Sequence, residues 1–240
     1  MIRYCRWWFA VPILLAVKLS PGHDLITGDA TERYLARASD YMQVIRSREA
    51  PERRGMASYE LGRMLDEIRE LLNRDIATHG KVQGLPSNIL VAEFQTRGVA
   101  LKRNGDSGRF SSPSLYFREA MRLVSGPEGS DAAFRWLRGE FYDAFDVDPL
   151  KPRGSWFQLE ERMAIADQLA RRIPPHVEAE EIEFIRIIQQ AQAARMVGDP
   201  AQAKEFAAGA RRGVGIFSRR YPDSLRNAAL EALVGNPVSR

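Results

Sequence analysis

Hydrophobic residues recur at intervals of three and four along most of the chain, and glycine and proline interrupt that pattern at corners. Such a pattern predicts amphipathic α-helices joined by short turns. Residues 89–91 are the one place where a short strand competes with a helix. We therefore expect an all-α fold of about eight or nine helices, with these ranges: 31–48, 51–79, 87–101, 114–124, 130–145, 156–172, 177–197, 201–220 and 225–234.

The corners are evenly spaced in the last third of the chain. Prolines 149, 175, 200 and 222 mark successive corners, separated by 26, 25 and 22 residues. A regular alternation of helix and corner is typical of stacked helical hairpins. The rhythm predicts a helical-hairpin array, or α-solenoid.

The same pattern of glycines and prolines predicts that the chain divides into four segments. Residues 1–22 form a signal peptide or an N-terminal anchor, and residues 23–103 form an N-terminal helical hairpin region. Residues 104–113 are rich in glycine, serine and asparagine and predict a flexible loop or boundary. Residues 114–240 form the helical array.

The N-terminal segment predicts export. Two arginines precede an apolar run from Trp7 to Val17, which has the length of a signal-peptide core and is short of a bilayer span. A small-residue triplet at residues 20–22 suits cleavage before His23. An uncleaved anchor or a buried first helix are the alternatives. We expect an extracytoplasmic protein, periplasmic or secreted, which meets a membrane only through residues 1–22.

Charge and cysteine content narrow the range of possible functions. Three bases and no acid lie within residues 1–22, so without them the net charge falls from +4 to +1. The 35 bases and 31 acids of the whole chain are interleaved, which argues against nucleic acid as a partner. Cys5 is the single cysteine. Beyond the N-terminal segment, thiol catalysis and cysteine metal sites are therefore excluded.

The last long hairpin carries a recognisable motif. Gly198 lies in the turn, Ala203 follows it, and the second helix ends at Tyr221 and Pro222. This hairpin resembles a tetratricopeptide repeat of the divergent kind found in bacterial envelope proteins. The resemblance places Ala191 and Ala203 at the small-residue positions where the two helices approach closely. The distance from Gly198 to Pro222 is 24 residues against about 17 in the repeat, so the second helix carries roughly one extra heptad. The resemblance implies a protein-binding scaffold without an active site.

Motifs for catalysis, cofactors and metals are missing from the sequence. The three histidines, His23, His79 and His176, are not at metal-ligand spacing. No nucleophile elbow, phosphate-binding loop or paired-histidine zinc helix occurs. An acidic cluster opens the helix over 177–197, where carboxylates stabilise the positive end of the helix dipole. We expect no catalytic residue, no cofactor and no metal.

Aromatic residues concentrate near the middle of the chain. Trp136 and Tyr142 fall off the apolar stripe of their helix, and Trp156 opens the next one. They are the candidate partner-binding residues, with core packing as the alternative reading. The stripe itself should pack inward, through Phe134, Leu137, Phe141 and Phe145.

Glycines inside the helix over 201–220 need an explanation, because each costs about 1 kcal/mol relative to alanine. Gly209, Gly213 and Gly215 form a small-residue face with neighbouring alanines. We expect a close helix crossing there, within the chain or against another chain.

The leading functional hypothesis is an exported scaffold or adaptor, similar to tetratricopeptide-repeat proteins, that binds other proteins and has no catalysis of its own. A second hypothesis is a helical enzyme or small-ligand-binding domain of the cell envelope. Its site would be assembled from distant residues such as Glu140, Tyr142 and the loop at 104–113. A third is a structural subunit of an envelope complex.

Overall fold

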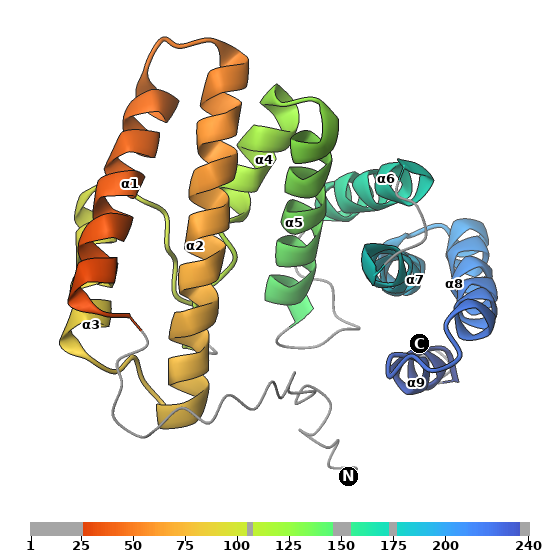
Figure 1. Cartoon of the computed structure of the whole chain (residues 1–240). Coiled ribbons are helices and arrows are strands. Elements are labelled where there is room, and N and C mark those ends of the chain that lie inside the picture. Colours follow the sequence, from red (N-terminus) through yellow and green to blue (C-terminus); the bar gives the residue numbers. More distant parts are fainter. Residues whose placement is uncertain (1–25, 105–107, 146–154, 173–176, 236–240) are drawn as a thin grey trace.

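The computed structural model describes residues 26–104, 108–145, 155–172 and 177–235, and every regular element among them is a helix (Figure 1). The prediction of an all-α fold is confirmed, and residues 89–91 lie inside a helix. An isolated bridge joins Arg103 and Phe110. The nine helices of these residues are α1 Gly28–Arg46, α2 Pro51–His79, α3 Leu85–Thr96, α4 Ser114–Leu123, α5 Gly126–Phe145, α6 Trp156–Arg172, α7 Val177–Met196, α8 Pro200–Arg220 and α9 Asn227–Gly235.

The helices follow one another through space much as they do along the chain. In Figure 1, α1 and α2 stand side by side, α4 and α5 come next, and α6 to α9 gather at the far side. Packing joins helices that are close in chain order, such as α1 with α2 and α3, α2 with α4, and α7 with α8. Since α7 packs against α5, α6, α8 and α9, it lies at the centre of the C-terminal part.

Two helix ends differ from the prediction by four residues or more. The third helix was expected to run through Leu101, but α3 ends at Thr96. Gly98 takes the left-handed conformation with φ of 69°, and the Val99 amide donates to the Phe94 carbonyl at 2.9 Å. Val99 and Leu101 still reach the core, but from extended chain.

The fifth helix begins earlier than predicted. It was expected from residue 130, but α5 starts at Gly126 and contains Pro127 in its first turn. Proline is tolerated there because the first amides of a helix have no intrahelical acceptor and its φ already suits the helix. A proline predicted to be a breaker is therefore a helix start.

The interior consists of two groups of buried side chains. The N-terminal core joins α1, α2 and α3 to the chain after α3, and the C-terminal core joins α4 to α9. α2 and α4 contribute to both groups. The N-terminal core contains Ile26, Ala38, Met42, Leu61, Met64, Leu65, Ile68, Leu72, Leu90, Phe94, Val99, Leu101, Phe110 and Tyr116. The C-terminal core is centred on Phe117, Trp136, Leu137, Phe141, Ile182, Ile185, Ile188 and Phe217.

The α7–α8 hairpin explains two of the helical glycines. A Cβ atom on Gly213 would lie 2.8 Å from Ile187 Cγ1 of α7, and one on Gly209 would lie 3.2 Å from Gln190 Oε1. The predicted close crossing is confirmed at these two positions, within the chain. Gly215 faces Arg219 of its own helix at 3.8 Å and takes no part in it.

Polar groups also enter the C-terminal core. Gln189 of α7 is 1% exposed, and neither its amide nitrogen nor its oxygen has a hydrogen-bond partner. Arg162 of α6 is 6% exposed, and among the described residues no carboxylate lies within ion-pair distance of its guanidinium. Burial lowers the pKa of Arg162, against the opposing effect of Glu140 and Glu161.

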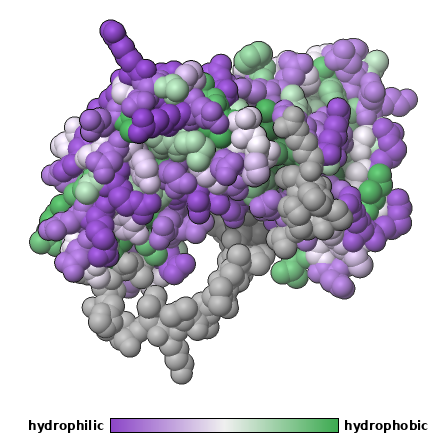
Figure 2. All heavy atoms as spheres, turned by 45° about the horizontal axis from the view of Figure 1, so that its top comes forward, coloured by the Kyte–Doolittle hydropathy of each residue, from purple (hydrophilic) through white to green (hydrophobic). Residues whose placement is uncertain are grey.

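The outer surface is mostly polar. Hydrophilic residues predominate on the face in Figure 2, and hydrophobic residues lie among them in separate patches. None of the helices described above is both long enough and apolar enough to cross a bilayer.

Candidate functional site

Trp136 does not lie on the surface. Its side chain belongs to the C-terminal core and is 4% exposed, as the core-packing alternative expected, and a role toward a partner stays a prediction. α5 is covered by α4 on one side and by α6 and α7 on others, so a ring off the main apolar stripe is buried as well. Phe134, Leu137 and Phe141 pack inward as predicted.

Tyr142 and Trp156 are half-buried. The Tyr142 ring meets Phe141 edge-on at 5.1 Å, and its hydroxyl donates to Glu181. Burial and the Glu181 carboxylate raise the pKa of Tyr142 to about 12. The Trp156 ring lies 5.9 Å from the Phe206 ring of α8. Both side chains thus join helices within the chain, and their roles toward a partner stay predictions.

The residues that carried the repeat resemblance occupy the α7–α8 hairpin. Gly198 is exposed in the turn, Ala203 is 6% exposed, and Ala191 is packed against the C-terminal core. Tyr221 caps the end of α8, with its ring 4.9 Å from that of Phe217, and the exposed Pro222 follows it.

The acidic cluster that opens α7 holds other helices in place. Glu181 pairs with Arg138 of α5 at 3.2 Å, and Glu180 pairs with Arg226 at 3.5 Å. Glu183 pairs with Arg220 at the end of α8. Since three of these carboxylates meet arginines from other parts of the chain, the cluster does more than complement the dipole of α7. Among the described residues, no group of three or more histidine, cysteine or acidic side chains is arranged to hold a metal ion.

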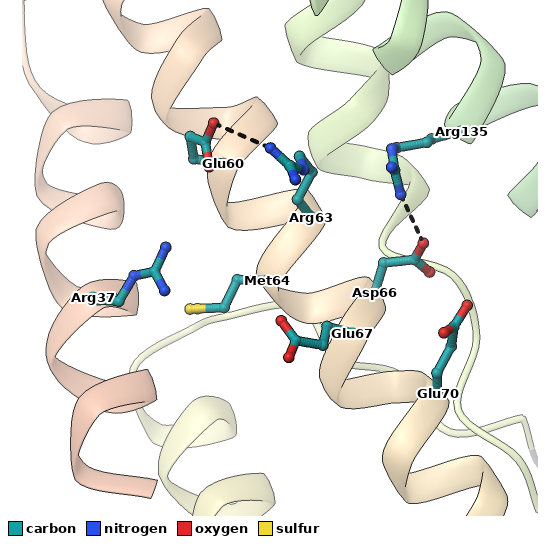
Figure 3. Close-up of a pocket in the computed structure, with 8 residues that line it drawn as sticks. All are labelled: Arg37, Glu60, Arg63, Met64, Asp66, Glu67, Glu70 and Arg135. Atoms are coloured by element: carbon teal, nitrogen blue, oxygen red, sulfur yellow. Dashed lines mark hydrogen bonds and ion pairs between the residues drawn. The ribbon is translucent and has the colours of Figure 1, made fainter. Parts of the chain in front are cut away.

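A pocket of about 450 Å³ opens over the exposed side of α2. α1 contributes Arg37 on one side of the pocket, and α5 contributes Arg135 on the other (Figure 3). The wall between them comes from α2 and consists of Glu60, Arg63, Met64, Asp66, Glu67 and Glu70. We call these eight residues the α2 groove. Ten residues separate Glu60 from Glu70, so the groove extends over about 15 Å of helix.

One wall of the α2 groove is held by an ionic network. Asp66 is 8% exposed and pairs with Arg69 at 2.7 Å and with Arg135 at 3.5 Å. Arg135 also donates to Asp131 at 2.7 Å, and the Tyr59 hydroxyl donates to the same carboxylate oxygen at 2.7 Å. Because each of these groups has a partner, we assign Asp66 and Arg135 to holding the groove in shape.

The other two arginines of the groove, Arg37 and Arg63, are less constrained. Arg37 donates to the Tyr41 hydroxyl at 3.2 Å, and among the described residues no carboxylate lies within 4.0 Å of its guanidinium. Arg63 lies over the Tyr59 ring at 5.6 Å and is 3.8 Å from Glu60, a loose ion pair. Both guanidinium groups are therefore available to an acidic ligand.

The acids of the groove are also accessible. The Tyr34 hydroxyl donates to Glu67 at 3.4 Å, and Glu70 stands 3.6 Å from Arg69. The lining thus places Arg37 beside α1, Arg63 and Arg135 toward α5, and negative groups toward the end of α2 (Figure 3). Such a surface suits a ligand that carries both signs of charge.

Comparisons with known proteins identify no relative of this chain. The chain matches no family model, and neither a curated protein nor a solved structure is significantly similar to it. The function must therefore be argued from the site.

Sequence reasoning missed the α2 groove. Glu60, Arg63, Glu67 and Glu70 form an alternating charged stripe of the kind that usually marks a solvated helix face. The one signal was the conjunction of this stripe with Tyr59, which supplies an aromatic ring under a guanidinium. The network behind it joins residues 59 and 131, a separation of 72, which no local pattern reveals.

Proposed function

We propose that this protein is an exported helical scaffold that binds a segment of another protein in the α2 groove. The observation that carries the proposal is an open, charged groove in which Arg37 meets no carboxylate of the described residues, beside a wall fixed by Asp66 and Arg135. A preorganised wall lowers the cost of binding, and an unpaired cation supplies attraction.

The shape and charge of the groove support a short peptide segment as the ligand. About 15 Å of groove accommodates four or five extended residues at about 3.3 Å each. An acidic side chain of the segment would meet Arg37 and Arg63, and a basic one would meet Glu67 or Glu70.

The order of packing supports an α-solenoid related to tetratricopeptide repeats as the scaffold. Helices contact those near them in the chain, and the α7–α8 hairpin has small residues at Ala203, Gly209 and Gly213 where its helices approach. In such arrays, binding surfaces are built from side chains of successive helices. The proposal assigns the chain no catalysis of its own.

The proposed location is outside the cytoplasm, periplasmic or secreted. It is supported by the two arginines and the apolar run from Trp7 to Val17. The near neutrality of the rest of the chain favours a protein partner over a nucleic acid.

The test is capture of a partner from envelope fractions by the full chain. A photo-crosslinking residue in place of Glu70 should link the groove to a defined polypeptide. Arg37→Glu combined with Arg63→Glu should reduce capture about tenfold or more, since like charges would then face the ligand's acid.

Arg211→Glu combined with Arg212→Glu is the matched control, because both arginines are exposed on α8 and the change in net charge is the same. Equal capture by both double variants, or equal loss from both, would show that the groove is not the binding site.

A further inference from the structure

The packing between α6 and α7 contains polar groups that the described fold leaves unpaired. Gln189 of α7 is 1% exposed, and neither polar atom of its amide has a hydrogen-bond partner. Arg162 of α6 is 6% exposed, and no carboxylate of the described residues comes within ion-pair distance of it. Unpaired buried polar groups are rare, and many are explained by a bound ion, a bound water or a functional role.

The register of the two helices brings these side chains to one level. α6 and α7 pack against each other and are joined by residues 173–176 alone, so they run in opposite directions (Figure 1). Arg186 of α7 donates to Asp167 of α6 at 2.7 Å, which aligns these two positions. Arg162 lies five residues before Asp167 and is therefore level with residue 191. Gln189 is two residues from that level, about 3 Å along the helix axis.

Both side chains are on the inward sides of their helices. Gln189 comes three residues after Arg186, so it shares the side of α7 that meets α6. Gln192, which is 6% exposed, lies one residue past the level of Arg162. Arg162 belongs to a buried stripe of α6 whose other members are at most 2% exposed: Leu159, Ala166 and Leu169. The guanidinium thus enters the same stretch of the α6–α7 packing as the unpaired amide.

The fold does not compensate for the burial of this cation. Burial lowers the pKa of Arg162, and the charges of Glu140 and Glu161 oppose that effect without cancelling it. Glu161 is already engaged by Arg118 of α4, at 2.7 and 2.9 Å. A guanidinium presents N–H groups in a fork that matches the oxygens of a carboxylate or a phosphate. An anion of this geometry would supply both the missing charge and the missing acceptors.

We propose that Arg162 and Gln189 form a binding site for a small oxyanion, the carboxylate or phosphate group of a ligand. The guanidinium would hold two oxygens of the group, and the amide nitrogen of Gln189 would donate to one of them. Because the other side chains of the α6 stripe are tightly buried, the site takes a group of a few atoms. This inference goes beyond the proposed function, since it uses neither the α2 groove nor the location of the protein.

The experiment measures urea denaturation of the full chain in sodium acetate or in inorganic phosphate, with sodium chloride at matched ionic strength as the reference. We expect at least one of the two anions to raise the midpoint in a saturable way, because a ligand that binds only the folded state stabilises it. Arg162→Met should abolish the saturable rise and retain only the general effect of the salt. Arg171→Met is the matched control, since Arg171 is exposed on the same helix, and it should respond as the original chain does.

A second variant tests the amide. Gln189→Leu should weaken binding of the anion about tenfold, because it removes one hydrogen bond to a charged group. In an isotope-labelled protein, the Nε–H resonance of Arg162 should also move as the anion is added, with the same concentration dependence as the midpoint.

The two anions separate the possible sources of the group. A response to acetate alone assigns the site to a carboxylate, and a response to phosphate alone assigns it to a phosphate group. An equal rise in the original chain and in Arg162→Met, or no rise with either anion, would overturn the proposal. Loss of the rise in the Arg37→Glu and Arg63→Glu double variant, with Arg162→Met unaffected, would place the anion in the α2 groove instead.

Discussion

α2 and α7 both carry polar side chains into the interior, but the buried amide of Asn73 on α2 is paired and that of Gln189 on α7 is not. Asp66 meets two arginines, Asn73 donates to and accepts from the backbone of Phe110, and Asp75 is bonded by His79 and Gln83. The Ser58 hydroxyl and the Arg54 Nε are the exceptions on α2. Each bond joins α2 to a different part of the chain or secures its end.

In the C-terminal part, Gln189 of α7 has no hydrogen-bond partner, and among the described residues no carboxylate lies within ion-pair distance of Arg162 of α6. A buried polar group stabilises the fold only when it is paired, and without a partner its desolvation is a cost. The comparison teaches that replacing a paired polar residue and replacing an unpaired one with an apolar residue should change the free energy of unfolding in opposite directions.

Asn73→Leu should produce the largest effect. The substitution keeps the volume but leaves both the amide and the carbonyl of Phe110 unpaired, and these are now bonded at 2.7 and 2.9 Å. Since each buried orphan costs about 1–3 kcal/mol, the free energy of unfolding should fall by about 3 kcal/mol. Urea denaturation measures it. An unchanged midpoint would mean that the α2 bonds do not secure the segment before α4.

Asn73 also restrains part of the segment that was predicted to be a flexible loop. Residues 104–113 were expected to be flexible, but Phe110 is 5% exposed and bonded to α2, and the Ser112 amide donates to Asp143 at 2.8 Å. Residues 105–107 lie outside the described residues.

Arg162→Met should have a smaller effect of the opposite sign. Removing a buried cation that has no close partner should raise the free energy of unfolding by about 1–2 kcal/mol. Arg135→Met is the matched control, because it removes a guanidinium that pairs with Asp131 and Asp66, and it should lower the free energy of unfolding by about 2 kcal/mol. If both variants were destabilised alike, the contrast between the two regions would be wrong.

The helices were predictable from the sequence because the 3.6-residue period is a local signal, and the range of α2 was predicted correctly. The end of α3 was not predicted correctly, since it depends on the left-handed conformation of Gly98. Trp136 could be assigned neither to the core nor to the surface, because one helix's stripe does not reveal how many neighbours will surround it. The groove depends on Arg135 meeting Asp66 across 69 residues. Contacts of this kind exist only after the helices have packed.

The smallest expected effect concerns two tyrosines, Tyr59 on α2 and Tyr142, which lies beside Glu181 of α7. Burial and a hydrogen bond to Asp131 raise the pKa of Tyr59 to about 12, and Tyr142 beside Glu181 has the same value. A raised pKa means that folding favours the neutral hydroxyl. Its contribution is complete below the ordinary value of 10.0 and is lost as pH rises through about 12.

We therefore expect the free energy of unfolding to decline between about pH 10 and 12, and each tyrosine to account for part of the slope. Tyr59→Phe and Tyr142→Phe should each flatten this decline when urea denaturation is repeated across that range. Tyr41→Phe is the control and should leave the slope unchanged, because the Tyr41 hydroxyl is bonded to Arg37 and not to a carboxylate. If Tyr142→Phe flattened the decline and Tyr59→Phe did not, the hydrogen bond from the Tyr59 hydroxyl to the Asp131 carboxylate would be absent in solution. α2 would then lose one of the partners that distinguish it from α7.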